Sequence, residues 1–415
     1  MRPAITSVVC LCVALVCVTS EAAAALTYEL TVAAGNHDRS NVPVCKVLLE
    51  AQQQGNARPA DLAAAKSVKL TDAAGMSLPA QLSAPGLCNQ PAAGAGKIVR
   101  ELHFIVPSLK KGETLKLTAA LSPDAPAAKG FAWKDAPGEE CDLSFDGRPM
   151  LRYMYKALDP KNREETYKVY HHVFDPAGKV LVTKGPGGLY THHRGLFFGY
   201  CAISHDGGKT DTWGCGGNAS QTHEKFLAQE TGPVMGRHLV SIAWRDGKGK
   251  AFLTEQRELT AYNTPGGTLI GFASRLTTTG GKVKLDGNAP HAGFQFRAAR
   301  EVGEKYAKET RYLRPDPKAE KGPARASAMD LAWDAMSFLV ADKRYTMLYL
   351  DKPTNPKPAE YNERDYGRFG SFFKYELDEG KDLLCDYRVW LQEGEMTLPQ
   401  AAALSADFVE PIEVK

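Results

Sequence analysis

The feature that most constrains the fold is a series of short alternating segments separated by tight-turn residues. Alternation of apolar and polar residues is the pattern of a half-buried strand, and Asp-Gly or Gly-Gly between two such runs indicates a turn between strands. Runs of this kind flank Asp146-Gly147, Asp175-Pro176-Ala177-Gly178, Asp246-Gly247 and Gly280-Gly281. Repeated strand-turn-strand units predict a mostly β protein built from antiparallel sheets.

The chain length of 415 residues indicates more than one domain. Short strand-like runs fill the first part, up to a segment rich in Pro, Ala and Gly at 122–140, which we interpret as a linker. We therefore predict a small N-terminal antiparallel β-sandwich at 26–130 and a larger antiparallel β-sandwich or supersandwich at 131–415. Near the end, Thr397 with Gln400 three residues later predicts a capped helix.

The first 25 residues read as a secretory signal peptide. Arg2 is followed by an apolar run at 5–18 that is too short to span a bilayer, and the alanines at 22–24 supply a cleavage pattern. We expect an exported protein, periplasmic or extracellular, without a membrane span. The net charge of +3 and the absence of a Lys/Arg run give no reason to expect a nucleic-acid partner.

Six cysteines follow the expected cleavage site, an even number that permits disulfides in an oxidising compartment. They are Cys45, Cys88, Cys141, Cys201, Cys215 and Cys385. We favour the pairs Cys45–Cys88 and Cys201–Cys215, and buried free thiols are an equal alternative. The sequence has no CxxC pair, so it predicts neither a zinc ribbon nor a thioredoxin-type site.

Common catalytic signatures are missing from the sequence. It has no P-loop, no GxSxG elbow and no EF-hand loop, and "THEKF" has Leu227 where a zincin needs its second histidine. An enzyme of this sequence would have to use residues that the fold gathers from distant segments.

The segment "GPGGLYTHHRGLFFGY" carries the most distinctive polar group, His192-His193-Arg194. If the chain is extended there, His192 and Arg194 share one face and His193 lies on the other. That arrangement disfavours a chelate by adjacent imidazoles, and Arg194 favours an anionic or polyhydroxyl ligand. The alternatives are that Arg194 pairs with a carboxylate while the imidazoles cap loop carbonyls, or that the histidines bind a metal.

Two later segments carry polar groups that could belong to the same pocket. In "HAGFQFRA", Gln295 and Arg297 share the strand face opposite to the phenylalanines, although His291 could be an ordinary strand-end histidine. In "ERDYGRFGSFF", Arg364 and Asp365 precede another aromatic strand. We interpret this second segment as a further wall of the pocket.

Three more residues are candidates with plain structural alternatives. His223 and Glu224 could form an acid/base pair in a loop, or only a surface pair. Trp213 could stack on a sugar ring, although core packing is the commoner role for such a residue.

Several segments together resemble an exported bacterial family, common in planctomycetes, that is often labelled "methane oxygenase PmoA" and is otherwise a domain of unknown function. They include "GGLYTHHRGLFFGY", "GRHLVSIAW", "HAGFQFRAA", "ERDYGRFGSFF" and "YRVWLQEGEMT". The resemblance covers nearly the whole chain after the signal peptide and brings no catalytic residues with it. The membrane PmoA subunit of particulate methane monooxygenase has several spanning helices, so the label does not transfer that chemistry.

Three functional hypotheses follow, and the first is a carbohydrate-binding or carbohydrate-modifying protein of mutarotase-like, lyase or hydrolase type. Its catalytic candidates are His192, His291, Glu224 and Asp365, and its substrate-binding candidates are His193, Arg194, Trp213, His223, Arg297 and Arg364. The second is a copper or zinc protein, with oxygenase-related activity as one form of it, that uses three of His192, His193, His223 and His291. The third is a non-catalytic envelope interaction module.

Overall fold

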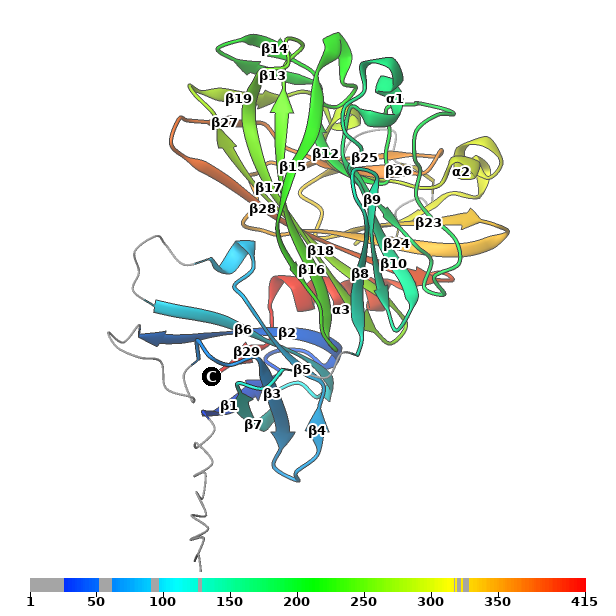
Figure 1. Ribbon diagram of the computed structural model, residues 1–415. Coiled ribbons are helices and arrows are strands. Elements are labelled where there is room, and N and C mark those ends of the chain that lie inside the picture. The colour runs from blue at the N-terminus through cyan, green and yellow to red at the C-terminus, as the bar shows by residue number, and fades with distance from the viewer. Residues whose placement is uncertain are drawn as a thin grey trace, which may run out of the picture.

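The computed structural model describes residues 26–51, 62–90, 97–125, 129–316, 318, 322–323 and 328–415. The proposed signal peptide lies outside the described residues. Neighbouring strands run antiparallel in all five sheets (Figure 1). The predicted mostly β fold with antiparallel sandwiches is confirmed.

Two small sheets form the N-terminal sandwich. The five-stranded sheet has the order β29 (Glu413–Val414), β1 (Thr27–Ala33), β7 (Thr114–Ser122), β3 (Ser67–Asp72) and β4 (Ser77–Leu78). The three-stranded sheet has the order β2 (Arg39–Ala51), β6 (Lys97–Leu109) and β5 (Ala80–Ser83). Alternate residues such as Leu30, Val44 and Phe104 pack between the two sheets, as the alternation in the sequence requires.

Two large sheets form the second sandwich, and a small sheet extends it at one end. The nine-stranded sheet has the order β22 (Ala328–Met329), β25 (Glu360–Arg364), β26 (Arg368–Phe372), β20 (Ala292–Arg297), β12 (Leu196–Tyr200), β11 (Tyr170–Val173), β10 (Arg148–Met154), β9 (Glu140–Phe145) and β8 (Phe131–Ala136). The eight-stranded sheet has the order β15 (Ser220–Glu230), β16 (Met235–Arg245), β17 (Ala251–Thr264), β18 (Gly267–Thr278), β28 (Asp382–Glu393), β24 (Lys343–Asp351), β23 (Asp334–Val340) and β21 (Arg311–Leu313). The four-stranded sheet has the order β14 (Gly208–Thr210), β13 (Ala202–His205), β19 (Val283–Asp286) and β27 (Tyr375–Leu377).

An aromatic core fills the space between the nine-stranded and eight-stranded sheets. Phe294 and Phe296 of β20 and Phe272 of β18 are fully buried in it, with the rings of Phe272 and Phe294 stacked 4.1 Å apart. Because successive strand residues point to opposite faces, the residues between these phenylalanines lie on the outside of the sandwich. That outer face of the nine-stranded sheet carries the candidate site described below.

Short helices connect or cover the sheets. Besides α1 (Arg163–Thr166) and α2 (Arg300–Glu304), the longest helix is α3 (Leu398–Val409), which lies at the junction of the two sandwiches (Figure 1). The predicted capping box of α3 is present: Thr397 accepts from the backbone of Gln400, whose side chain accepts from the backbone of Thr397. None of the helices in the described ranges is long and apolar enough to cross a membrane.

The structure departs from the expected linker and from the end of the predicted second domain. The segment at 122–140 contains β8, because Phe131 is buried in the core despite the Pro- and Ala-rich surroundings. The last strand, β29, pairs with β1 of the N-terminal sandwich, although we expected 131–415 to form one domain.

The predicted turns and disulfides have different outcomes. Asp146 and Gly147 have φ angles of 46° and 79° between β9 and β10, as a two-residue hairpin requires. Gly280-Gly281 instead separates β18 and β19, which belong to different sheets. All six cysteines are free thiols, so neither Cys45–Cys88 nor Cys201–Cys215 is bonded in the structure.

Candidate functional site

The candidate site lies on the outer face of the nine-stranded sheet. On β20, Phe294 and Phe296 enter the core while Gln295 and Arg297 lie on the opposite face, as predicted from the alternation. On β26, Phe369 enters the core and Arg368 lies on the same outer face as Arg297. These polar side chains are nevertheless fully buried, because loops cover this face of the sheet.

Three arginines are direct cross-strand neighbours on this face. Arg368 of β26 pairs in register with Arg364 of β25 on one side and with Arg297 of β20 on the other. We call Arg297, Arg364 and Arg368 the arginine row. Like charges directly opposite each other on a sheet are destabilising, so the row carries an electrostatic cost in the absence of a compensating anion.

The arginine row is held by neutral groups. Arg368 donates to Gln295 Oε1 at 2.9 Å and to Asn362 Oδ1 at 2.8 Å. Arg297 donates to the carbonyl oxygen of Ala298 at 2.9 Å, and Arg364 donates to that of Glu363 at 2.8 Å. Among the described residues, no carboxylate forms an ion pair with any arginine of the row.

The loop that carries His192 and His193 lies beside the row, and its conformation contradicts the predicted alternation. The chain becomes a strand only at Leu196, so His192 and His193 occupy a turn and do not point to opposite faces. Their rings contact each other with centroids 4.4 Å apart, and the ring of His193 is 6.0 Å from that of Tyr366. Tyr366 in turn lies under the Arg297 guanidinium at 5.0 Å.

The Arg194 side chain contacts groups of the protein itself in this arrangement. Its side chain is fully buried and donates to backbone carbonyl oxygens of Thr191, His193 and Glu164. The guanidinium also lies over the ring of Tyr167 at 5.1 Å. No carboxylate pairs with Arg194 among the described residues, and its contacts fix the shape of the loop; ligand contact by Arg194 stays a prediction.

His193, Trp213 and His291 complete the site. The Trp213 indole lies 5.8 Å from the imidazole of His193 and 6.3 Å from that of His291, measured between ring centroids. The Arg368 guanidinium lies over the indole at 5.7 Å. His193 Nδ1 and Trp213 Nε1 are buried and have no hydrogen-bond partner in the described part of the chain. Most such buried groups are paired, so two unpaired nitrogens in contacting rings indicate a place where a ligand or water completes the bonding.

Several basic groups of the site have lowered pKa values. Burial, aided by Lys168 and Arg194, lowers the pKa of His192 to about 3, and burial with Arg368 lowers the pKa of His193. Burial also lowers the pKa of Arg297 to about 10. Burial is the first cause of each of these shifts, and neighbouring cations add to it.

Two buried lysines add to this positive charge. Lys168 donates to the carbonyl oxygen of Trp213, and Lys184 donates to that of Gly185 at 2.9 Å. Burial lowers the pKa of Lys168 to about 8 and that of Lys184 to about 7, with Arg194 contributing to both shifts. Several perturbed ionisable groups gathered in one place are typical of a functional site.

The rim of the site is accessible to solvent. Tyr190 is 45% exposed and its ring lies 4.8 Å from that of Tyr366. His291 and Asp365 are exposed, and His291 is held by Asn288 Oδ1 at 2.8 Å from its Nδ1. An exposed aromatic pair beside buried donors can stack on the C–H face of a sugar while the donors bind a polar substituent.

His223 and Glu224 lie elsewhere. They belong to β15 rather than to a loop, and His223 Nδ1 is 3.2 Å from the hydroxyl of Tyr153. Glu224 forms a surface ion pair with Arg245 at 2.9 Å. No hydrogen bond joins His223 to Glu224, and among the described residues no three of His192, His193, His223 and His291 have ligand atoms that all lie within 4.8 Å of one another. The acid/base and metal roles stay predictions.

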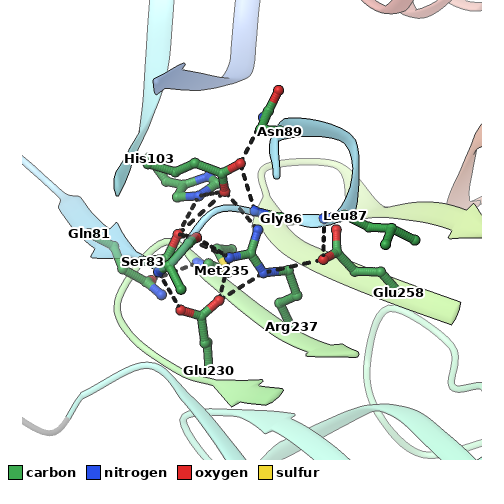
Figure 2. Close-up of polar contacts among 12 residues, drawn as sticks. Gln81, Ser83, Gly86, Leu87, Asn89, His103, Glu230, Met235, Arg237 and Glu258 are labelled. Atoms are coloured by element: carbon green, nitrogen blue, oxygen red, sulfur yellow. Dashed lines mark hydrogen bonds and ion pairs between the residues drawn. The ribbon is translucent and has the colours of Figure 1, made fainter. Parts of the chain in front are cut away.

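A second polar cluster, which the sequence analysis missed, lies where the two sandwiches meet (Figure 2). Arg237 of β16 contacts Glu101 of β6 at 2.7 Å, and also Glu230 and Glu258. Beside it lies a pocket of about 140 Å³, next to a larger one of about 300 Å³ that shares Arg388. No sequence-predicted site residue lines either pocket. Glu101 and His103 alternate with core residues in "RELHF", which is the signal that could have indicated a polar strand face.

Comparisons with known proteins identify a family and a weak likeness in fold. The model of a family of unknown function, DUF6807, matches residues 140–406, which include the whole arginine row; it carries no PmoA label. A search of curated proteins returned no match.

Three of the solved structures that resemble this chain in fold are the following. An α-mannosidase from Enterococcus faecalis V583 has 8% identity and a TM-score of 0.44, over 94% of this chain and 46% of that one. A glycosyl hydrolase family 38 protein from Enterococcus faecalis has 9% identity and a TM-score of 0.44, over 94% and 47%. The galactosidase domain of an α-galactosidase–sucrose kinase has 10% identity and a TM-score of 0.35, over 63% and 42%. The chain spans less than half of each of these proteins, and similarity at this level carries no argument about activity.

Proposed function

The chain belongs to the DUF6807 family of unknown function, and we propose that it binds an anionic carbohydrate at the arginine row. The observation that carries this proposal is the register of Arg364, Arg368 and Arg297, three neighbouring cations with no ion-pair partner among the described residues. A carboxylate or sulfate group on the ligand would offset their repulsion, since guanidinium groups bind planar and tetrahedral oxyanions with paired hydrogen bonds.

The carbohydrate part of the proposal rests on the rim. The exposed Tyr190 and the half-buried Tyr366 form an aromatic pair beside the cations, and the unpaired nitrogens of His193 and Trp213 supply further hydrogen-bonding groups. A sugar ring combines an apolar C–H face with hydroxyl groups, and an aromatic surface flanked by donors matches both.

Binding is better supported than acid/base catalysis. With its pKa near 3, His192 stays neutral at pH 7 and is a weak base. Burial also lowers the pKa of His291, the other histidine that we considered for catalysis. Asp365 is exposed at the rim and is the remaining candidate for proton transfer to a bound sugar.

The test is calorimetry with matched oligosaccharides, in sulfated, uronate-containing and neutral forms. We expect binding of the charged forms and a loss of about 10-fold or more in affinity for Arg364→Gln, because a hydrogen bond to a charged group contributes about 1.5–3 kcal/mol. Arg245→Gln removes a partly exposed arginine on β16 and is the matched control. Equal affinity for charged and neutral sugars, or no binding of either, would refute the proposal.

Inorganic sulfate separates the two parts of the proposal. Tyr190→Ala should weaken oligosaccharide binding while leaving sulfate binding unchanged, because Tyr190 belongs to the aromatic rim. If the wild-type protein and Tyr190→Ala bind sulfate equally well and also bind the charged sugars equally well, the site recognises only an anion and the carbohydrate assignment is wrong.

We also propose that the protein is exported. Residues 1–25 have the charge, apolar run and alanines of a cleaved leader. The test is the N-terminal sequence of the protein recovered from a bacterial periplasm or culture medium, which we expect to begin near Ala25. Recovery of uncleaved protein only in the cytoplasm would contradict it.

A further inference from the structure

The smaller pocket at the junction of the two sandwiches has a donor set unlike that of the arginine row. Its volume is about 140 Å³, below the range of about 300–1,000 Å³ that is usual for small-molecule sites. Its charged and metal-ligating lining comprises two thiols, an imidazole, three carboxylates and two guanidinium groups, from Cys45, Cys88, His103, Glu101, Glu258, Asp386, Arg237 and Arg388. Both its size and its chemistry suit an ion better than a sugar.

Strand geometry gathers three of these donors. Cys45 of β2 lies directly opposite His103 of β6 in the strand register. Glu101, two residues before His103, lies on the same face because side chains alternate along a strand. One ligand atom from each of these residues lies within 4.8 Å of the other two. Their neighbours along the strands, Val44, Leu102 and Phe104, point into the N-terminal core. The side chains of Cys45, Glu101 and His103 therefore point away from that core.

The distances resemble those of a tetrahedral metal site. Nitrogen and oxygen ligands at 2.0–2.2 Å from zinc stand roughly 3.4 Å from each other in a tetrahedron, and His103 Nε2 lies 3.1 Å from Glu101 Oε2. On the other side of the ring, His103 Nδ1 lies 3.4 Å from the hydroxyl of Tyr262. A ligating histidine needs such an acceptor for its second nitrogen.

Carboxylates outnumber guanidinium groups at the junction, which favours a bound cation. Glu101, Glu230 and Glu258 all lie within ion-pair distance of one guanidinium, that of Arg237. Glu101 Oε2 contacts Arg237 at 2.7 Å and His103 Nε2 at 3.1 Å and also accepts from Ser83, so a metal bound between Glu101 and His103 would replace the direct contact of these two side chains. Asp386 and Arg388 also line the pocket, so carboxylates still outnumber guanidinium groups there, while burial raises the pKa of Glu258 to about 7 and reduces that surplus.

We propose that Cys45, Glu101 and His103 bind one divalent ion with the ligand preference of zinc. Sulfur, imidazole and carboxylate together select such an ion over magnesium or calcium, which prefer oxygen ligands alone. Cys88 lines the same pocket and supplies the fourth position, either directly or through water. On binding, the S–H bond of Cys45 breaks, its proton goes to solvent and the sulfur electron pair forms the bond to the metal; no oxidation or reduction is involved.

The test uses the full chain, stripped with a chelator and titrated with Zn²⁺ against a chromogenic competitor. We expect one zinc ion per chain, and Co²⁺ in its place should give a thiolate-to-metal charge-transfer band. Cys45→Ser, at an exposed position, should remove the band and weaken zinc binding by more than about 100-fold, above the effect typical of an outer-shell change. Cys201→Ser, a half-buried cysteine elsewhere, should leave both unchanged.

Each other outcome counts against the site. Zinc retained at full affinity by Cys45→Ser, or absent from the wild-type chain at micromolar concentrations, would overturn the proposal. If His103→Gln unfolds the protein, the Cys45→Ser result alone decides. Because these residues do not line the arginine row, a negative result here leaves the proposed carbohydrate site untouched.

Discussion

The rings of His193 and Trp213 meet edge to face with 5.8 Å between their centroids, and each has a buried nitrogen without a hydrogen-bond partner among the described residues. Leaving a buried polar group unpaired costs about 1–3 kcal/mol. The pair therefore contributes two of the unpaired buried nitrogens of the site, and replacing Trp213, whose indole lies under the Arg368 guanidinium, tests its part in binding.

Replacing Trp213 by Phe should change the free energy of unfolding by less than about 1.5 kcal/mol, because the lost volume is partly offset by removal of the unpaired N–H. Affinity for the anionic sugar should fall several-fold. The comparison is Trp244→Phe, which removes an indole N–H that donates to Glu255 Oε2 at 2.8 Å and should cost more stability. Unchanged affinity for Trp213→Phe in a folded protein would contradict a role of this nitrogen in binding. Denaturant titration and calorimetry measure the two effects.

Stability should rise with pH between about 7 and 10. Burial holds the pKa of Lys168 near 8 and that of Lys184 near 7, below the ordinary value of 10.5. Between those values the unfolded chain binds more protons than the folded one, so the free energy of unfolding increases as pH rises. Urea titrations across this range should show a smaller slope for Lys168→Met, whereas Lys248→Met, at an exposed position, should keep the slope. Equal slopes for all three proteins would show that Lys168 titrates normally.

Anion affinity should change with pH in the opposite direction. Lys184 and Lys168 are charged below their folded pKa values of about 7 and 8 and neutral above them. Affinity for a sulfated sugar should therefore decrease as pH rises from 6 to 9. Binding of the sugar should in turn raise the protonated fraction of the two lysine amines, so the protein should take up protons when it binds. Calorimetry in buffers of different ionisation enthalpy would detect this proton uptake. A pH-independent affinity without proton uptake would show that neither lysine faces the ligand.

Arg194 should matter for stability rather than for ligand contact. Its guanidinium donates to three backbone carbonyl oxygens, and each bond to a charged group contributes about 1.5–3 kcal/mol. Arg194→Ala should cost about 3 kcal/mol or more of unfolding free energy, and Arg194→Lys should recover only part of it, since an ammonium lacks the planar fork. Arg300→Ala removes an exposed arginine bonded to Pro186 of the same loop and should cost less than about 1 kcal/mol. A stable Arg194→Ala protein with reduced affinity would reverse this assignment.

Gly195 should be intolerant of a side chain. A Cβ atom there would lie 2.3 Å from the carbonyl oxygen of His171, so the loop would have to move away from β11. Gly195→Ala should cost about 1–3 kcal/mol and weaken ligand binding together with stability. Gly280→Ala, whose Cβ would meet no atom within 4 Å, should be close to neutral. The thermal midpoints of the two variants give a direct comparison.

Local sequence patterns predicted the structure correctly where it depends on a single strand, turn or helix cap. Asp146-Gly147 predicted its hairpin and Thr397 with Gln400 predicted its cap, because backbone conformation at these positions follows from neighbouring residues. The face shared by Gln295 and Arg297 also followed from alternation. The same rule failed at His192 and His193 because the chain there is a turn, and alternation holds only within a strand.

The parts of the site that could not be predicted depend on pairing between distant strands. Arg368 stands in the same segment as Arg364, but its position opposite Arg297 depends on the order of β25, β26 and β20. Similarly, Cys45 and His103 lie 58 positions apart (103 − 45) in the sequence and meet only through the register of β2 and β6. A single sequence contains no measure of such pairings.

The pairing of β29 with β1 has a consequence for how the chain can assemble. The backbone of Thr31 exchanges hydrogen bonds with Lys415 at 2.9 and 3.0 Å, and Lys46 Nζ donates to the carbonyl oxygen of Val414. Because β29 is synthesised long after β1, the outer edge of the first sheet stays open while the second sandwich is being made. A nascent chain therefore exposes the free edge of β1 until β29 has emerged and can pair with it.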